Sequence, residues 1–142
     1  MDRSVNTEQV RAVFDAFAAR DAVRLLELVH PEIEFHTVTG PLAERSEPYR
    51  GHAGLTDYLR DVALVWEELR PEAQELRDVG EDTVLVLGRV YAWGSGRVID
   101  GPAGWVWRMR DGLAVYGRVY ESRGEALAAV GLDEQGRGSS GP

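Results

Sequence analysis

The segment from Glu81 to Ser122 constrains the fold most, because it is patterned as consecutive antiparallel hairpins. Runs of β-branched and aromatic residues cover positions 83–93, 97–110 and 113–120, and short turn segments separate them: Gly94-Ser95-Gly96 and Asp111-Gly112. Asp-Gly between two apolar runs is the strongest indication of a hairpin turn in this chain. Since three of the four Trp lie in this segment, we predict a long aromatic sheet that can line one wall of a pocket.

Helical patterns dominate the residues before this sheet. Asn6 is positioned to cap a first helix, whose apolar face recurs at helical spacing and includes Phe14 and Phe17. Asp21 is predicted to cap a second, shorter helix that Pro31 stops. The remaining expectations are a strand at 33–38, a loop at 40–51, a helix from His52 to Pro71, a strand at 72–79 and a closing helix at 123–130.

This order of elements predicts an α+β fold. We expect a cone-shaped, curved antiparallel sheet with the N-terminal helices packed across its concave face, in a single domain covering residues 1–132. Residues 133–142 are rich in Gly and Ser and are predicted to be a disordered C-terminal tail. The wide end of such a cone is a natural ligand cavity.

Charge and composition exclude several function classes. A formal net charge of −8 argues against a nucleic acid or an anionic membrane as partner, because both require a basic surface. There is no Cys and no His pair at metal-binding spacing, so we predict neither a thiolate nor a metal site. No apolar run approaches the ~20 residues of a membrane span. The N-terminal residues lack the pattern of a signal peptide, so a cytoplasmic location is expected.

Six segments of the chain together carry a resemblance to a known family: residues 17–21, 29–36, 49–54, 84–89, 107–112 and 118–127. They resemble a SnoaL-like domain of the nuclear-transport-factor-2-like superfamily, which includes ketosteroid isomerases, polyketide cyclases and limonene epoxide hydrolases. The resemblance implies a cone-shaped α+β barrel with a deep apolar pocket, and frequently a homodimer. It does not imply one reaction, because this fold includes enzymes and non-catalytic proteins.

The resemblance also implies which positions would carry catalysis. His36 occupies the place of the carboxylate that shuttles protons in ketosteroid isomerases, and imidazole is chemically able to replace it. The matching positions for the Tyr and the acid of those isomerases are near Val13 and near Gly104 or Trp105. The familiar catalytic sets are therefore incomplete in this chain.

Epoxide hydrolases and SnoaL-type cyclases place an acid on the last strand, at the position of Val119. Glu121 lies two residues further on, on the same predicted strand face, and could substitute nearer the mouth of the pocket. If the domain is an enzyme, we expect His36 as the acid or base and Glu121 or a Tyr as its polar partner.

Strand alternation selects the residues expected to contact a ligand. Trp105, Trp107 and Met109 share one strand face, which we predict to be concave, and the small Gly117 and Val119 beside them would leave room for a ligand. The alternative is that these Trp side chains are only core. The predicted ligand-binding residues are Phe14, Phe17, Tyr49, Tyr58, Trp66, Trp105, Trp107, Met109, Gly117 and Val119.

Three arginines, Arg89, Arg108 and Arg118, recur near the middle of the predicted strands. An exterior position is favoured, because unpaired charge is costly to bury. The alternative reverses the strand faces and forms an arginine cluster for a carboxylate ligand.

We expect a protein that binds a small, largely apolar organic molecule, with isomerisation or cyclisation by proton transfer as its candidate chemistry. Such chemistry needs only a positioned base and stabilisation of an enolate, so no cofactor is expected. The competing hypothesis is a non-catalytic ligand-binding or dimerisation module. An enzyme should have two or more convergent polar groups deep in the cavity, whereas a pure binding protein should have one or none.

Overall fold

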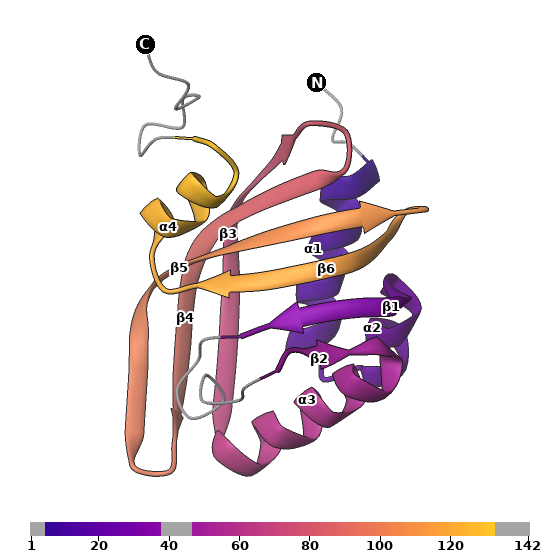
Figure 1. Ribbon diagram of the computed structural model, residues 1–142. Helices are drawn as coiled ribbons and strands as arrows, with labels where there is room; N and C mark the ends of the chain where they lie inside the picture. The colour runs from indigo at the N-terminus through magenta and orange to yellow at the C-terminus, as the bar shows by residue number, and fades with distance from the viewer. Residues whose placement is uncertain (1–4, 38–46, 133–142) are drawn as a thin grey trace.

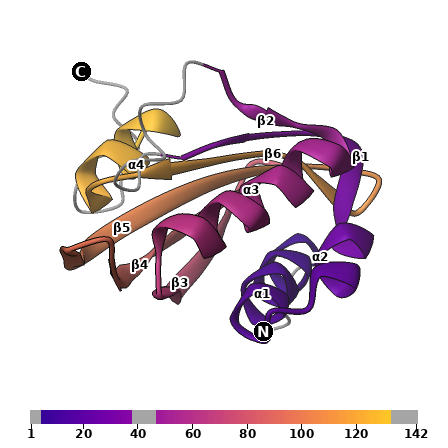
Figure 2. The same cartoon turned by 90° about the horizontal axis from the view of Figure 1, so that it is seen from below.

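The computed structural model describes residues 5–37 and 47–132 and forms one curved, open sheet with helices on both faces (Figures 1 and 2). The strand order is β2-β1-β6-β5-β4-β3. The predicted tail and most of the predicted loop at 40–51 lie outside the described residues. The elements are α1 (Val5–Ala18), α2 (Ala22–Leu28), β1 (Val29–His36), β2 (Tyr49–Arg50), α3 (Gly51–Val65), β3 (Glu68–Val79), β4 (Thr83–Gly94), β5 (Arg97–Arg110), β6 (Leu113–Tyr120) and α4 (Arg123–Ala129).

The predicted meander is confirmed, because β3, β4, β5 and β6 pair in sequence order as antiparallel neighbours. Two-residue loops join β4 to β5 and β5 to β6, at Ser95-Gly96 and Asp111-Gly112. All four loop residues have positive φ, between 51° and 76°. That geometry belongs to the type I′ turn, whose twist matches that of the flanking strands.

The predicted curved sheet is antiparallel in all its strand pairs but one, which the sequence did not predict. β1 lies parallel to β6 and antiparallel to the short β2. A parallel neighbour is possible because a long crossover, containing α3 and the first three strands of the meander, separates β1 from β6 in the chain. The α+β class itself is confirmed.

The third helix ends earlier than its apolar pattern predicted. It stops at Val65, and Pro71 lies inside β3 instead of terminating a helix. β3 is an edge strand, where a missing backbone N–H is tolerated. Pro31 likewise lies within β1, in the interval between Val29 and Glu34 where the pairing with β6 shifts register.

The helix starts were predicted with mixed success. Asp21 caps α2 as expected, since its carboxylate accepts a hydrogen bond from the backbone N–H of Arg24. Asn6 does not cap α1, which begins at Val5; instead its side-chain amide donates to the carbonyl oxygen of Glu81. This bond ties the first turn of α1 to the β3–β4 turn.

Two apolar clusters lie on opposite faces of the sheet. The larger cluster lies between the concave face and α1, α2 and α3, which confirms the predicted position of the N-terminal helices (Figure 2). The smaller one packs beneath α4 on the other face and contains Leu85, Leu87, Val106, Ala126 and Leu127. Arg89, Arg108 and Arg118 are exposed, which confirms the exterior position favoured from the sequence. Within the described residues, no helix is long and apolar enough to cross a membrane.

Candidate functional site: an apolar chamber

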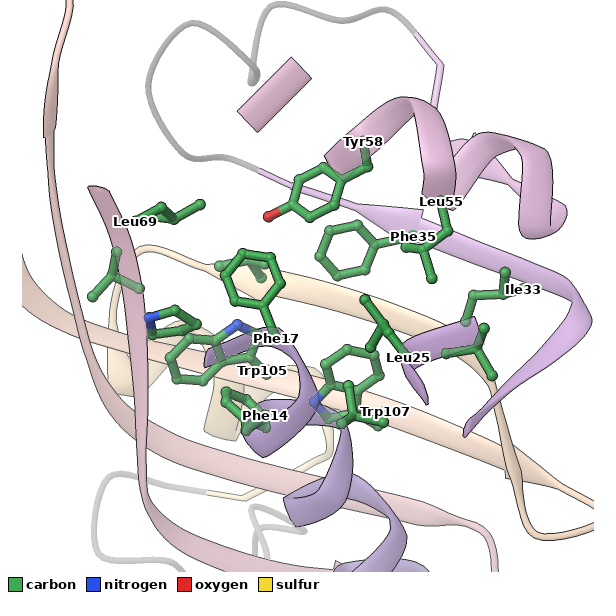
Figure 3. Close-up of a pocket in the computed structure, with 15 residues that line it drawn as sticks. Phe14, Phe17, Leu25, Ile33, Phe35, Leu55, Tyr58, Leu69, Trp105 and Trp107 are labelled. Carbon is green, nitrogen blue, oxygen red and sulfur yellow. The ribbon is translucent and has the colours of Figure 1, made fainter. Parts of the chain in front are cut away.

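A cavity of about 60 Å³ lies inside the larger cluster, between the concave face of the sheet and the N-terminal helices (Figure 3). We call it the chamber. Its lining combines aliphatic and aromatic side chains from helices and strands that are distant in sequence. The lining residues are Val13, Phe14, Phe17, Leu25, Val29, Ile33, Phe35, Leu55, Tyr58, Leu69, Pro71, Val90, Trp105, Trp107 and Val119.

The twofold alternation of the strands produces this wall. Trp105 and Trp107 point to the concave face of β5, while Val106 between them belongs to the cluster under α4. Ile33 and Phe35 alternate in the same way on β1. The opposite wall comes from the buried stripe of α1, which presents residues spaced three and four apart.

Aromatic contacts fix the shape of the wall. Phe14 meets the Trp105 ring edge to face, with centroids 5.0 Å apart and planes at 88°. Trp107 stacks on Phe35 at 5.9 Å and 21°. Phe35 also contacts Tyr58 at 4.9 Å. These offset and edge-to-face geometries are the ones that aromatic pairs prefer, so the rings hold one another in place.

The chamber contains few polar atoms. The indole Nε1 of Trp107 is buried and has no hydrogen-bond partner among the described residues. The hydroxyl of Tyr58 points toward the interior of the cavity (Figure 3). Burial is the main cause that raises the pKa of this phenol, so Tyr58 stays protonated at neutral pH and acts as a hydrogen-bond donor. The site therefore offers donors to a ligand that carries an acceptor oxygen.

His36 lies away from the chamber, because its neighbour Phe35 points into it and successive residues of a strand face opposite ways. Its Nε2 lies 2.6 Å from a carboxylate oxygen of Glu34, and its ring lies 5.5 Å from that of Tyr116. This hydrogen bond is the main cause that lowers the pKa of Glu34. Glu121, the other predicted catalytic residue, is exposed just beyond the end of β6 and is not part of the lining.

Six of the predicted ligand-binding residues line the chamber: Phe14, Phe17, Tyr58, Trp105, Trp107 and Val119. The other four lie elsewhere. Tyr49 is buried on β2, with its hydroxyl donating to Asp61 at 2.7 Å, and Met109 is core. Trp66 lines a separate groove between α1, α2 and α3. Gly117 does not leave open space, because the Trp107 ring lies directly over it.

Most of the lining was not predicted. Strand alternation over 33–38 places Ile33 and Phe35 on one face, and this pattern is sufficient to identify both as lining residues. The prediction selected His36, which lies on the opposite face. Leu69 and Pro71 fell in a segment assigned to a helix and its end, whereas the structure places both on β3. A bulge at Val115 also shifts the register of β6. As a result Ala114, and not Val115, is buried in the larger apolar cluster.

The chamber includes positions that the resemblance marked as catalytic in other proteins. Val13, Trp105 and Val119 all line it, and each carries an apolar side chain here. None of the lining residues among the described part of the chain is a carboxylate or an imidazole. The residues described also contain no group of three or more His, Asp or Glu placed to hold a metal ion.

Comparison with known proteins gives a consistent picture. Residues 10–117 match the family described as the SnoaL-like domain. No curated protein matches the chain. Among solved structures, the chain is similar to an NTF2-like protein of unknown function from Burkholderia pseudomallei, with 23% identity, coverage of 90% of this chain and 98% of that one, and a TM-score of 0.75.

Two further structures are similar. TerC, crystallised with polyporic acid, is 29% identical over 82% of this chain and 90% of its own, with a TM-score of 0.68. A protein from Jannaschia, named as a candidate SnoaL-like polyketide cyclase, is 19% identical over 84% of this chain and 90% of its own, with a TM-score of 0.67.

Proposed function

The chain belongs to the SnoaL-like domain family, and we propose that it binds a small, largely apolar organic molecule in the chamber. The proposal rests on the chemistry of the lining, which is apolar except for donor groups on aromatic rings. Sites for small molecules are typically apolar with a few placed polar groups that set orientation. TerC, the relative crystallised with polyporic acid, adds support for an organic ligand.

One observation carries the proposal further: the buried, unpartnered indole Nε1 of Trp107. A buried donor without a partner costs about 1–3 kcal/mol, and a ligand oxygen would remove that cost. The Tyr58 hydroxyl supplies a second donor directed into the cavity (Figure 3). We infer that the ligand carries a carbonyl or a similar acceptor oxygen on an apolar, ring-sized body.

Binding is favoured over proton-transfer catalysis. Donors such as Tyr58 and Trp107 could polarise a carbonyl, but isomerisation or cyclisation also needs a base close to the carbon that loses its proton. His36 and Glu121 were the predicted candidates, and neither lines the chamber. Isomerase or cyclase activity therefore remains the second proposal, and it requires a base from outside the described lining.

Acetophenone and ethylbenzene test the binding proposal, because they have nearly the same shape and only acetophenone has an acceptor oxygen. We expect acetophenone to bind the protein more tightly in calorimetric titrations. Tyr58→Phe should reduce this preference, because only the Trp107 donor remains, and should leave ethylbenzene affinity unchanged. Tyr91→Phe, which alters a tyrosine outside the chamber, is the matched control. Failure of both compounds to bind would contradict an apolar ligand site, and an unchanged preference in Tyr58→Phe would contradict the role of its hydroxyl as a donor.

The homodimer and the cytoplasmic location expected from the sequence remain predictions. The outer face of β1 and β6 presents His36, Tyr116 and Arg118, a mixed aromatic and charged surface of the kind that protein interfaces use. Sedimentation velocity across a range of protein concentrations tests the dimer directly, with a species of about twice the monomer mass of 15.7 kDa as the expected result.

A further inference from the structure

We propose that the ligand is an amphiphile, whose apolar end occupies the chamber and whose carboxylate is bound by Arg20 in an adjoining groove between α1, α2 and α3. This inference rests on the proposed function, since it requires a ligand in the chamber. It adds the class of the ligand and a second, charged part of the site.

The groove is larger than the chamber, at about 480 Å³. Phe17 and Leu25 line both spaces, so these two side chains lie at the boundary between them. The groove's other lining residues are Ala16, Arg20, Asp21, Ala22, Leu59, Val62, Ala63, Trp66 and Glu67. The groove thus combines apolar with charged side chains, whereas none of the described residues that line the chamber is charged.

The size of the chamber indicates that a ligand extends beyond it. At about 60 Å³ the chamber is smaller than the ~150 Å³ apolar cavity that accepts benzene in another protein. A ring can enter only if a lining side chain moves. Movement of Phe17 or Leu25 would join the chamber to the groove, because both side chains border the two spaces. A ligand seated in this way has its outer end in the groove.

Arg20 is the cation at this boundary. Its guanidinium lies 5.0 Å from the centroid of the Phe17 ring, and its Nη2 makes only a long contact, 3.4 Å, with the carbonyl oxygen of Leu69. Phe17 and Leu69 both line the chamber. No ion pair joins Arg20 to a carboxylate among the described residues. The donor groups of Arg20 that do not contact Leu69 therefore remain available to an anion.

Trp66 supplies a second donor in the lining of the groove. Its side chain is only 4% exposed, and its indole Nε1 is buried without a hydrogen-bond partner among the residues described. An indole N–H can donate but cannot accept. An unpaired donor and an unpaired cation around one groove favour a ligand group that is rich in acceptor oxygens, and a carboxylate is the strongest such group.

Two carboxylates also line the groove, and they define the rival outcome. Asp21 is committed to capping α2, because its side chain accepts the backbone N–H of Arg24 at 3.0 Å. Glu67 is exposed immediately before β3. If these acids dominated the local field, the groove would select an amine instead of a carboxylate.

Three probes with the same phenylalkyl body separate these outcomes: 4-phenylbutanoate, its methyl ester and 4-phenylbutylamine. We expect 4-phenylbutanoate to bind the intact protein about tenfold more tightly than the ester, as a charge-assisted hydrogen bond would produce. Arg20→Gln should remove that advantage without changing the affinity for the ester. Arg24→Gln is the control, because Arg24 is a nearby exposed arginine that pairs with Glu27 and is not part of the groove lining.

A salt titration of the unaltered protein provides a second measurement that needs no variant. Rising NaCl should weaken 4-phenylbutanoate binding and leave the ester unaffected. Equal affinities for acid and ester, or an unchanged preference in Arg20→Gln, would overturn the inference while leaving the apolar site intact. Tightest binding by 4-phenylbutylamine would also overturn the inference, because it would show that Asp21 and Glu67 determine the charge that the groove selects. If neither acid nor ester binds, the proposed function fails as well.

Discussion

Gly117 on β6 lies directly beneath the indole ring of Trp107 on β5, so closely that a Cβ at position 117 would be 2.5 Å from the ring atom Cζ3. The two residues are cross-strand partners. The absent side chain is what allows Trp107 to lie flat against the sheet and stack on Phe35. One glycine therefore determines the position of one of the two largest side chains in the chamber wall.

Gly117→Ala should accordingly destabilise the protein. The new methyl group would push the Trp107 ring off Phe35, and overpacking of this kind costs about 1–3 kcal/mol. Chemical denaturation with urea measures the loss. Gly101→Ala is the matched control on the same sheet, because a Cβ there meets no atom within 4 Å and should change the unfolding free energy little. Equal stability of the two variants would show that the ring can move without cost.

Alkaline pH should destabilise the fold through Tyr58. Burial raises the pKa of this phenol above its ordinary value of 10.0 in the folded protein. Between the two values the unfolded chain releases a proton that the folded chain retains. Stability is therefore complete below pH 10 and declines as pH rises above it, by at most about 1.4 kcal/mol per pH unit for one group.

The sequence contains no lysine to titrate in the same range. Burial also raises the pKa of Tyr120, so the contribution of Tyr58 is taken from the difference between the unaltered protein and Tyr58→Phe. Melting temperatures from pH 8 to 11 should fall less steeply for Tyr58→Phe than for the unaltered protein. Tyr91→Phe should follow the unaltered protein. A Tyr58→Phe curve of unchanged slope would mean that Tyr58 ionises in the folded state as it does in the unfolded state.

Val119→Asp places an acid where the resembling hydrolases and cyclases carry one. Val119 is 5% exposed in an apolar wall, so burial should raise the pKa of the new carboxyl and the variant should be about 3 kcal/mol less stable at pH 7. The penalty should shrink as pH falls toward about 3.9, where the unfolded chain also binds the proton. Val98→Asp, at a position that is 71% exposed, should show no such pH dependence.

The meander was predictable because its determinants are local. Turn residues such as Asp111 and Gly112 set each hairpin, and strand alternation then assigns Trp105 and Trp107 to one face. The pairing of β1 with β6 was not predictable from local pattern, because it joins segments about 80 positions apart and runs parallel. The end of α3 was missed for a similar reason. Apolar spacing continues through Leu69, but pairing of β3 with β4 overrides it from Glu68 onward.

The candidate site was predicted only in part, because local pattern identifies some of its residues and long-range packing decides the others. Residues on strongly periodic elements, such as Phe14 and Trp107, were identified from their spacing. The direction of His36 depends on which face of β1 meets the helices, and that is decided by long-range packing of Phe35 against Tyr58 and Trp107. The groove beside Arg20 depends on how three helices meet, which no local pattern encodes.

The indole N–H resonance of Trp107 in a ¹H–¹⁵N spectrum tests the central proposal most directly, because this donor is buried in the chamber wall and unpartnered among the described residues. Phe substitutions at the four Trp positions assign the four indole signals. On titration with acetophenone, the Trp107 signal should shift downfield and saturate, while that of the exposed Trp93 stays in place. A Trp107 signal that does not move as acetophenone saturates the protein, or a shift confined to Trp93, would contradict ligand binding in the chamber.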